Sequence, residues 1–422
     1  MQSAIRRHLL ASSRQRRSLW TRATASGKDL KECIATVCAP WKNKRINACI
    51  ALVSKSFNDY SNVARELNEQ LTPATMVGAV VDRVAGLQHG VTLYIGSEDE
   101  EVVGFHIADS RERHKVRSIS VGRWGRVEDF DRLRFQGNKL DESGWDVFGT
   151  ISRPAQHHVL PQSLQGCSDM PSFIFMASDN EPDHLLQALD HHYPQTTKLG
   201  IIGASTPFIT GEPYMLFDKD HPQMAAGIVG LAAFNKSKKN VDVTIEHTSL
   251  KPLGQPMTIT RCRGNIILDL DQAGATGLLL ALIQQGQNAR IAKDQEFYLG
   301  IYPPGHRDCD PTKMAVNRIT SGDPSRGNMS IDTTADLQVG QVVQFMKRVT
   351  VSSELTAEEG SSALAVVDRD HTIDASPIHL PEKGRLLEDV FGAASENGII
   401  LGRPGLSSQI LDVPFSKAKF NL

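Results

Sequence analysis

The chain has 422 residues, 46 basic and 48 acidic side chains and a formal net charge of −2, with 40% hydrophobic and 22% charged residues. This length accommodates two or three globular domains. No apolar run approaches the roughly 18 residues of a membrane-spanning helix, so the composition argues against a helical membrane span.

The first 24 residues differ in composition from the rest of the chain. They contain six arginines interspersed with serines, and the first acidic residue is Asp29. Such a start is typical of a mitochondrial transit peptide, and it lacks the unbroken apolar centre of a secretory signal. We therefore predict a transit peptide at residues 1–24, removed between Leu19 and Thr24, and a mitochondrial location, with the matrix favoured. The plainer alternative is a disordered basic tail.

Removal of this leader changes the charge of the protein. Without its six arginines the chain has 40 basic and 48 acidic residues, a net charge of −8. A chain of this charge has no general attraction for nucleic acid or anionic lipid. We expect a small-molecule or protein partner, no nucleic acid and no membrane span.

The six cysteines are scattered and do not form a recognisable pattern. No C-x-x-C occurs, and no Cys/His spacing resembles a zinc site. We predict reduced, mostly buried thiols and no metal ligands, and no cofactor is indicated.

The first ordered element that the pattern predicts is a strand at residues 46–53. Apolar residues from Tyr60 to Leu71 recur at helical spacing and predict an amphipathic helix that ends at Thr72 and Pro73. Short β-rich runs follow at 74–82, 90–97 and 102–108.

A similar order of elements begins at Pro171. A strand, a helix over 179–193, a strand over 198–205 and two further β-rich runs correspond to the first half. The offset is close to 125 residues and pairs Gly78 with Gly203. We predict an internal repeat of residues 46–106 and 171–233.

The remaining segments are less regular. Residues 110–170 read as an irregular arm, and a new unit of alternating strands and one helix starts at residue 240. Past residue 351 periodicity is low, with one helix expected at 385–394. The predicted fold class is α/β (α+β), with mixed sheets flanked by helices, a duplicated N-terminal part and a C-terminal α/β part.

The stretch LGIIGASTPF (199–208) is the first candidate site. Its glycines suggest a phosphate cradle, but a loop containing Pro207 follows where such a cradle needs a helix. Nor does Ser205 lie in a G-x-S-x-G elbow, so no catalytic residue is predicted. A buried strand with close packing or a bulge at Gly203, and likewise at Gly78, is the simpler interpretation. If a small polar ligand binds, we expect it at this strand end, at Gly203, Ser205 and Thr206, facing Arg261.

The second candidate is the loop YPPGHRDCDP (302–311). It collects His306 and Arg307 in a Pro-bounded segment, and functional groups often lie on such loops. An ordinary solvated turn is the alternative.

Several runs resemble the FIST family, the predicted sensory domains of bacterial signalling proteins and eukaryotic F-box proteins. The runs TPATMVGA (72–79), YPQTTKLGIIGAS (193–205) and AAGIVGLA (225–232) resemble its N-terminal part. Its C-terminal part is similar to the runs PLGQPMTITRCRGNIILDLDQAGA (252–275), NRITSGDPSRGNMSID (317–332) and VGQVVQFMKR (339–348).

The resemblance covers residues 46–350 and implies a domain organisation. It implies a FIST N-like domain at 46–239 and a FIST C-like domain at 240–422 with a divergent C-terminal extension. No F-box-like helical segment fits between the leader and Ile46, so assembly into a ubiquitin ligase is not implied. Haem binding by some bacterial members directs attention to His184, His191 and His192, although histidines at a helix end are common.

The resemblance implies a non-enzymatic module of the FIST type that senses a small ligand or binds a protein, acting in mitochondria. The alternative is a hydrolase- or transferase-like enzyme with a pocket between the two domains, lined by the 302–311 loop.

Overall fold

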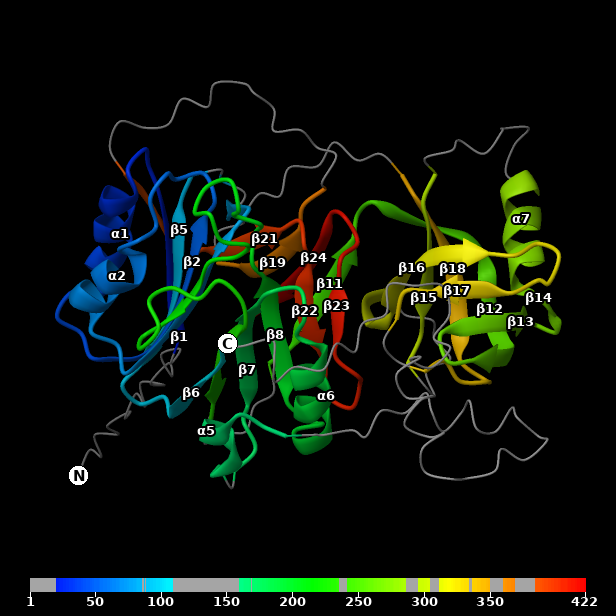
Figure 1. The fold of residues 1–422 in the computed structure, drawn as a ribbon, viewed down its shortest axis with the longest axis horizontal. Helices are drawn as coiled ribbons and strands as arrows, with labels where there is room; N and C mark the ends of the chain where they lie inside the picture. Colours follow the sequence, from blue (N-terminus) through cyan, green and yellow to red (C-terminus); the bar gives the residue numbers. More distant parts are fainter. Residues whose placement is uncertain are drawn as a thin grey trace, which may run out of the picture.

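The computed structural model describes residues 20–85, 87, 89–108, 159–167, 169–234, 241–285, 295–303, 311–333, 336–349, 360–368 and 384–422. It is a mixed α/β fold with four sheets and few helices, as the sequence predicts (Figure 1). Within these residues no helix is both long enough and apolar enough to cross a membrane.

The first sheet has the strand order β20-β1-β5-β2-β3-β9. Its strands are β20 (Arg385–Glu388), β1 (Trp20–Ser26), β5 (Val91–Ser97), β2 (Ile46–Ser54), β3 (Thr75–Val81) and β9 (Leu216–Asp218). Helices α1 (Leu30–Cys38) and α2 (Val63–Leu71) cover one face with their apolar sides, and the 3-10 turn η1 (Ala39–Trp41) follows α1. The Asp29 side chain caps α1 by accepting a hydrogen bond from the Glu32 backbone N–H.

The second sheet has the order β23-β22-β8-β7-β10-β6. Its strands are β23 (Gln409–Leu411), β22 (Ile399–Gly402), β8 (Thr197–Ile202), β7 (Phe173–Ser178), β10 (Ile228–Ala233) and β6 (Val102–Ile107). Helices α5 (Gln162–Gln165) and α6 (Asp183–His192) pack on its outer face.

The third sheet joins the first two around one core. It has the order β11-β24-β19-β21-β4 and consists of β11 (Val243–His247), β24 (Ser416–Phe420), β19 (Ser362–Val366), β21 (Phe391–Ser395) and β4 (Arg83–Val84). Aromatic rings connect the sheets: Trp20 packs edge-on against Phe173 at 5.2 Å between centroids, and Tyr94 packs against Phe391 at 5.0 Å. The apolar interior is therefore shared by all three sheets.

The fourth sheet closes on itself. Its order is β12-β18-β15-β16-β17-β13-β14, and an additional β12–β13 pairing joins six of the strands into a ring. The strands are β12 (Leu250–Arg263), β18 (Val342–Arg348), β15 (Phe297–Ile301), β16 (Ala315–Gly322), β17 (Met329–Ile331), β13 (Ile266–Leu270) and β14 (Ala273–Gly274). Helix α7 (Ala275–Gln285) lies beside it, and the 3-10 turn η3 (Pro311–Lys313) precedes β16.

The same strand–helix–strand arrangement occurs in the first two sheets. Strands β2 and β3 are parallel with β5 antiparallel beside β2, and β7 and β8 are parallel with β10 antiparallel beside β7. The bounds of the repeat differ from the predicted 46–106 and 171–233. Strand β6, which ends the first predicted copy, belongs to the second sheet, where it pairs with β10. The counterpart of β5 is therefore β10, and β9 is an edge strand on β3.

The predicted equivalence of Gly78 and Gly203 is wrong. Ser54 at the end of β2 lies opposite Val81, and Ser178 at the end of β7 lies opposite Ile202. When the two serines are matched, Val81 corresponds to Ile202. Gly203 then follows its strand, whereas Gly78 lies inside β3.

Three further expectations are corrected by the structure. The first described strand is β1 and not residues 46–53, and α1 also precedes β2. Residues 385–394 form β20 and the start of β21 instead of a helix. The sheets do not follow the predicted boundary at residue 240, because β20, β22 and β23 belong to the first two sheets. The predicted arm at 110–170 lies mostly outside the described residues.

Candidate functional site

The backbone at Gly203 connects sheets instead of facing an open site. Its N–H donates to the Ser178 carbonyl at 2.8 Å, and its own carbonyl accepts from the Asn397 side-chain amide at 2.9 Å. The next residue, Ala204, donates its N–H to the Val80 carbonyl at 2.9 Å. These groups join the second sheet to the first and to the segment after β21, so they are engaged in the fold.

Thr206 closes the turn that follows. Its side chain is buried, its hydroxyl donates to the Glu212 carbonyl at 3.0 Å, and its N–H donates to the Pro213 carbonyl at 3.0 Å. Ser205 is exposed. Of these two predicted ligand-binding hydroxyls, one is structural and the other faces solvent.

Arg261 does not face this strand end. It lies on β12 in the closed fourth sheet, its side chain is 65% exposed, and its Nε is 2.9 Å from a carboxylate oxygen of Asp269 on β13. The predicted site of Gly203, Ser205, Thr206 and Arg261 is therefore not assembled. His306 and Arg307 lie outside the described residues.

Lys55 supplies a cation at the ends of the parallel strands β2 and β3. It follows β2 and forms an ion pair with Asp82, which follows β3 and has a 5% exposed side chain. Asp82 Oδ2 also accepts the Glu396 backbone N–H at 2.8 Å. This arrangement fastens the segment after β21 to the first sheet, a contact between residues more than 300 positions apart that no local pattern reveals.

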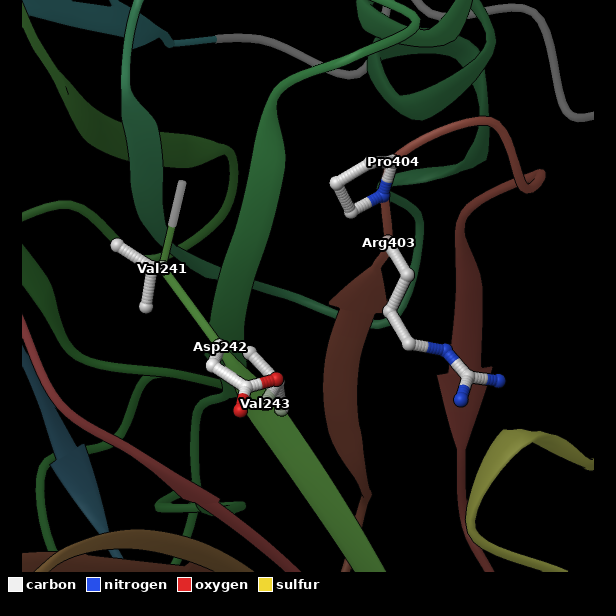
Figure 2. A pocket seen from close by; sticks show the side chains of 5 residues that line it. All are labelled: Val241, Asp242, Val243, Arg403 and Pro404. Atoms are coloured by element: carbon white, nitrogen blue, oxygen red, sulfur yellow. The ribbon is translucent and has the colours of Figure 1, made fainter. Parts of the chain in front are cut away.

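A cavity of about 210 Å³ lies where β11 begins and the chain leaves β22 (Figure 2). Two valines and a proline give it apolar walls, and Asp242 and Arg403 carry opposite charges on its two sides. Its lining residues are Val241, Asp242, Val243, Arg403 and Pro404. A hydrogen bond holds the wall that contains Val241, because the Val241 carbonyl accepts from the Thr197 hydroxyl at 3.0 Å.

Arg403 connects this cavity to the part of the chain that contains the closed sheet. Its Nη1 donates to the Thr312 carbonyl at 2.8 Å and its Nη2 to the Lys313 carbonyl at 2.6 Å, both in η3. Burial and then the positive charge of Arg403 lower the pKa of His247, on β11, to about 4.

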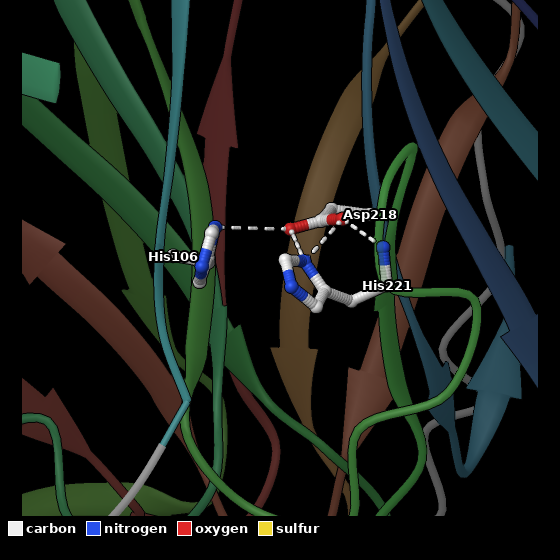
Figure 3. A group of neighbouring side chains, drawn as sticks. All are labelled: His106, Asp218 and His221. Atoms are coloured by element: carbon white, nitrogen blue, oxygen red, sulfur yellow. Dashed lines mark hydrogen bonds and ion pairs between the residues drawn. The ribbon is translucent and has the colours of Figure 1, made fainter.

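A second cluster of functional groups lies where the edge strands of the first two sheets meet (Figure 3). His106 is on β6, Asp218 ends β9, and His221 belongs to the turn after β9. His106 Nδ1 is 3.4 Å from Asp218 Oδ2, and His221 Nδ1 is 3.1 Å from Asp218 Oδ1. Each of these three side chains offers one atom that could bind a metal ion, and the three atoms all lie within 4.8 Å of one another.

Sequence reasoning missed this cluster. The run DKDH (218–221) by itself indicates only a polar turn, and the prediction of no metal ligands rests on Cys/His spacing along the chain alone. The local signal is the D-x-x-H spacing of Asp218 and His221. His106 comes from a strand more than 100 residues earlier, so only the sheet topology brings it there.

The histidines of α6 and the described cysteines offer little chemistry. His191 and His192 are exposed near the end of α6, and their rings lie 5.0 Å apart. Burial raises the pKa of Cys33 and of Cys38 to about 12, which disfavours a reactive thiolate. The five described cysteines are free thiols.

Comparison with known proteins gives a family. The FIST N domain model matches residues 47–273, just over half of the chain, from β2 to the first residue of β14. The comparison with curated proteins gave no match.

Proposed function

Starting from the fact that the chain belongs to the FIST N domain family, we propose that it is a non-enzymatic module that senses a small ligand and acts in mitochondria. Small-ligand sensing and signal transduction are the functions associated with FIST domains. The ligand is a small molecule that binds at the cavity of Figure 2.

The observation that carries the ligand site is the pairing of charges across this cavity. Asp242 and Arg403 offer one negative and one positive group, and Val241, Val243 and Pro404 offer apolar contacts. A volume of about 210 Å³ is below the roughly 300–1,000 Å³ of pockets that hold drug-sized molecules. The class that fits is a small zwitterion of amino-acid size with an aliphatic or short polar side chain.

Binding there would be transmitted through the fold. The cavity adjoins β11, which leads through Thr248 and Ser249 into β12 of the closed sheet, and Arg403 binds η3. Side chains from the three-sheet part and from the part that contains the closed sheet share one core, among them Ile245, Tyr298 and Tyr302. A ligand would therefore stabilise the junction between the two parts more than it would open a hinge.

A thermal-shift screen of small metabolites tests this proposal. We expect one class of zwitterionic compound to raise the melting temperature of the wild type. Asp242→Asn should abolish the shift with an unchanged melting temperature without ligand, because Asp242 is exposed. Arg261→Gln, in the fourth sheet, is the matched control and should retain the full shift. An unchanged response in Asp242→Asn would remove this cavity as the site, and turnover of the ligand would favour an enzyme.

The mitochondrial location rests on the leader. The composition of residues 1–19 supports it, with five arginines and no acidic residue. Because β1 begins at Trp20, we place the end of the leader before this residue instead of at 24. A reporter carrying residues 1–30 should enter mitochondria, and the triple change of Arg14, Arg16 and Arg17 to Glu should leave it cytosolic. A native leader that leaves the reporter in the cytosol contradicts import.

We also propose that the closed sheet is the FIST C-like part. The three runs that resemble this part of the family fall on β12 to β14, on β16 to β17 and on β18. They are thus strands of one sheet, which supports a common unit extending beyond the matched residues.

A further inference from the structure

We propose that His106, Asp218 and His221 form a binding site for one divalent first-row transition metal ion such as Zn²⁺. Two imidazoles and one carboxylate are a ligand set that suits zinc, iron and related ions. The site is formed by β6 and β9 and is separate from the cavity at Arg403 (Figure 3).

The spacing of the ligand atoms fits a metal ion. At metal–ligand bonds of about 2.0–2.1 Å, two ligands of a tetrahedral ion lie about 3.3 Å apart. Asp218 Oδ2 is 3.4 Å from His106 Nδ1 and 3.2 Å from His221 Nδ1. The two histidine rings are 4.2 Å apart between centroids. One ligand atom from each of the three side chains lies within 4.8 Å of the other two, a spacing that suits a common ion.

The carboxylate is held in position before any ion binds. Asp218 Oδ1 accepts the backbone N–H groups of Asp220 at 2.8 Å and His221 at 2.6 Å. The Asp218 N–H in turn donates to the His221 carbonyl at 2.9 Å, which closes the turn. These bonds orient the carboxylate, leave Oδ2 directed at both imidazoles, and are the kind of support that metal-binding carboxylates receive.

The turn and the strands around it are also fixed. Lys219 donates to the Pro73 carbonyl at 3.0 Å, and His106 lies opposite Val229 in the β6–β10 pairing. The ligands therefore come from two sheets whose mutual position is set by the core. Binding of an ion would not require the fold to rearrange.

The exposure of the ligands predicts an open coordination site. The side chains of His106 and His221 are 42% and 41% exposed, whereas that of Asp218 is 11% exposed. An ion held by three protein ligands at this edge keeps at least one position for water or an exogenous ligand, unlike a closed structural zinc site with four protein ligands.

Isothermal titration calorimetry of the tag-free, metal-stripped full chain with ZnCl₂ tests the proposal. We expect one ion per chain. His106→Gln and His221→Gln should each weaken binding at least about 10-fold. Asp218→Asn should weaken it similarly while keeping the turn, because the amide oxygen still accepts the two backbone N–H groups. His191→Gln on α6 is the matched control and should bind like the wild type.

Cobalt distinguishes this site from adventitious binding to cysteines. The Co²⁺ complex should show ligand-field bands of a nitrogen and oxygen site without thiolate charge transfer. Circular dichroism should show that each variant is folded. Thiolate charge transfer, unaltered Zn²⁺ affinity in folded His106→Gln, or the absence of a one-to-one site in the wild type would each overturn the proposal.

Discussion

Two glycines of the first two sheets differ in what surrounds them. A Cβ added at Gly78 would overlap the Ala51 carbonyl oxygen and the ring of Phe217, which lies directly opposite on β9. At Gly203 the nearest atoms to an added Cβ are side-chain carbons of Leu216 and Tyr214 at 3.4 Å, an ordinary contact. The sequence predicted close packing at both Gly203 and Gly78, and the structure confirms it at Gly78 but not at Gly203.

We therefore expect Gly78→Ala to destabilise the protein by about 1–3 kcal/mol or more, because the obstructing atoms include backbone. Gly203→Ala should change stability by no more than about 0.5 kcal/mol. Denaturation with urea measures both variants. Equal destabilisation by the two changes would contradict this interpretation.

His247 gives the fold a pH dependence of defined sign. Burial, reinforced by Arg403, lowers its pKa from 6.5 to about 4. Between these two values the unfolded chain binds a proton that the folded chain does not, so the contribution of His247 to stability is lost as the pH falls through this window.

His247→Asn should remove this contribution while preserving a polar partner for Ser416, whose hydroxyl is 2.7 Å from Nδ1. As the pH is lowered from 6.5 to 4, we expect the unfolding free energy of the variant to decrease less than that of the wild type. Urea denaturation across this range measures the difference. His191→Gln is the control, and a slope in His247→Asn equal to that of the wild type would exclude the assigned role.

Strand β1 marks how far the N-terminus can be shortened. It lies between β20 and β5, and Trp20, only 5% exposed, packs against Phe173 in the second sheet. A protein starting at Trp20 should keep the melting temperature of the full chain to within a few degrees. A protein starting at Ala25 loses most of an interior strand and should be insoluble or aggregated. Size-exclusion chromatography and thermal melts of the two proteins decide this, and equal behaviour would show that β1 is dispensable.

Elements with strong local periodicity were predictable, and those defined by distant partners were not. The apolar spacing from Tyr60 to Leu71 identified α2, and the buried runs identified β2, β7 and β8. The segment RLLEDVFGAAS (385–395) has helical spacing, yet Asp389 has a positive φ of 54° and the flanking residues pair with β1 and β19. Tertiary pairing overrides local propensity there.

Two elements and one cluster of side chains were missed for related reasons. Strand β1 and α1 adjoin an arginine-rich leader that dominates the composition, although the D-x-x-E pattern of Asp29 and Glu32 indicates the start of α1. The His106–Asp218–His221 cluster depends on which edge strands meet, information that a single sequence does not contain.

The whole molecule depends on its C-terminal segment. Residues 384–422 supply β20 to the first sheet, β22 and β23 to the second, and β21 and β24 to the third. A fragment of residues 20–349, which contains the family match and all strands of the closed sheet, would expose the apolar faces that these strands and β19 cover. We expect it to aggregate or to bind a hydrophobic dye, and co-expression with residues 360–422 should restore solubility. A monomeric 20–349 fragment that unfolds cooperatively would contradict this dependence.

The pairing of β1 with β20 also affects when the protein becomes folded during its synthesis. Arg22 binds Asp389, 367 positions later, and Ala23 lies opposite Glu388. At a translation rate of roughly 5–20 residues per second, β20 emerges roughly 20–70 s after β1. The first sheet cannot be completed until nearly the whole chain has been made, so its apolar surface stays uncovered through most of synthesis. A chain that terminates early never obtains these strands, and the cell can recognise it by the apolar surface it leaves open.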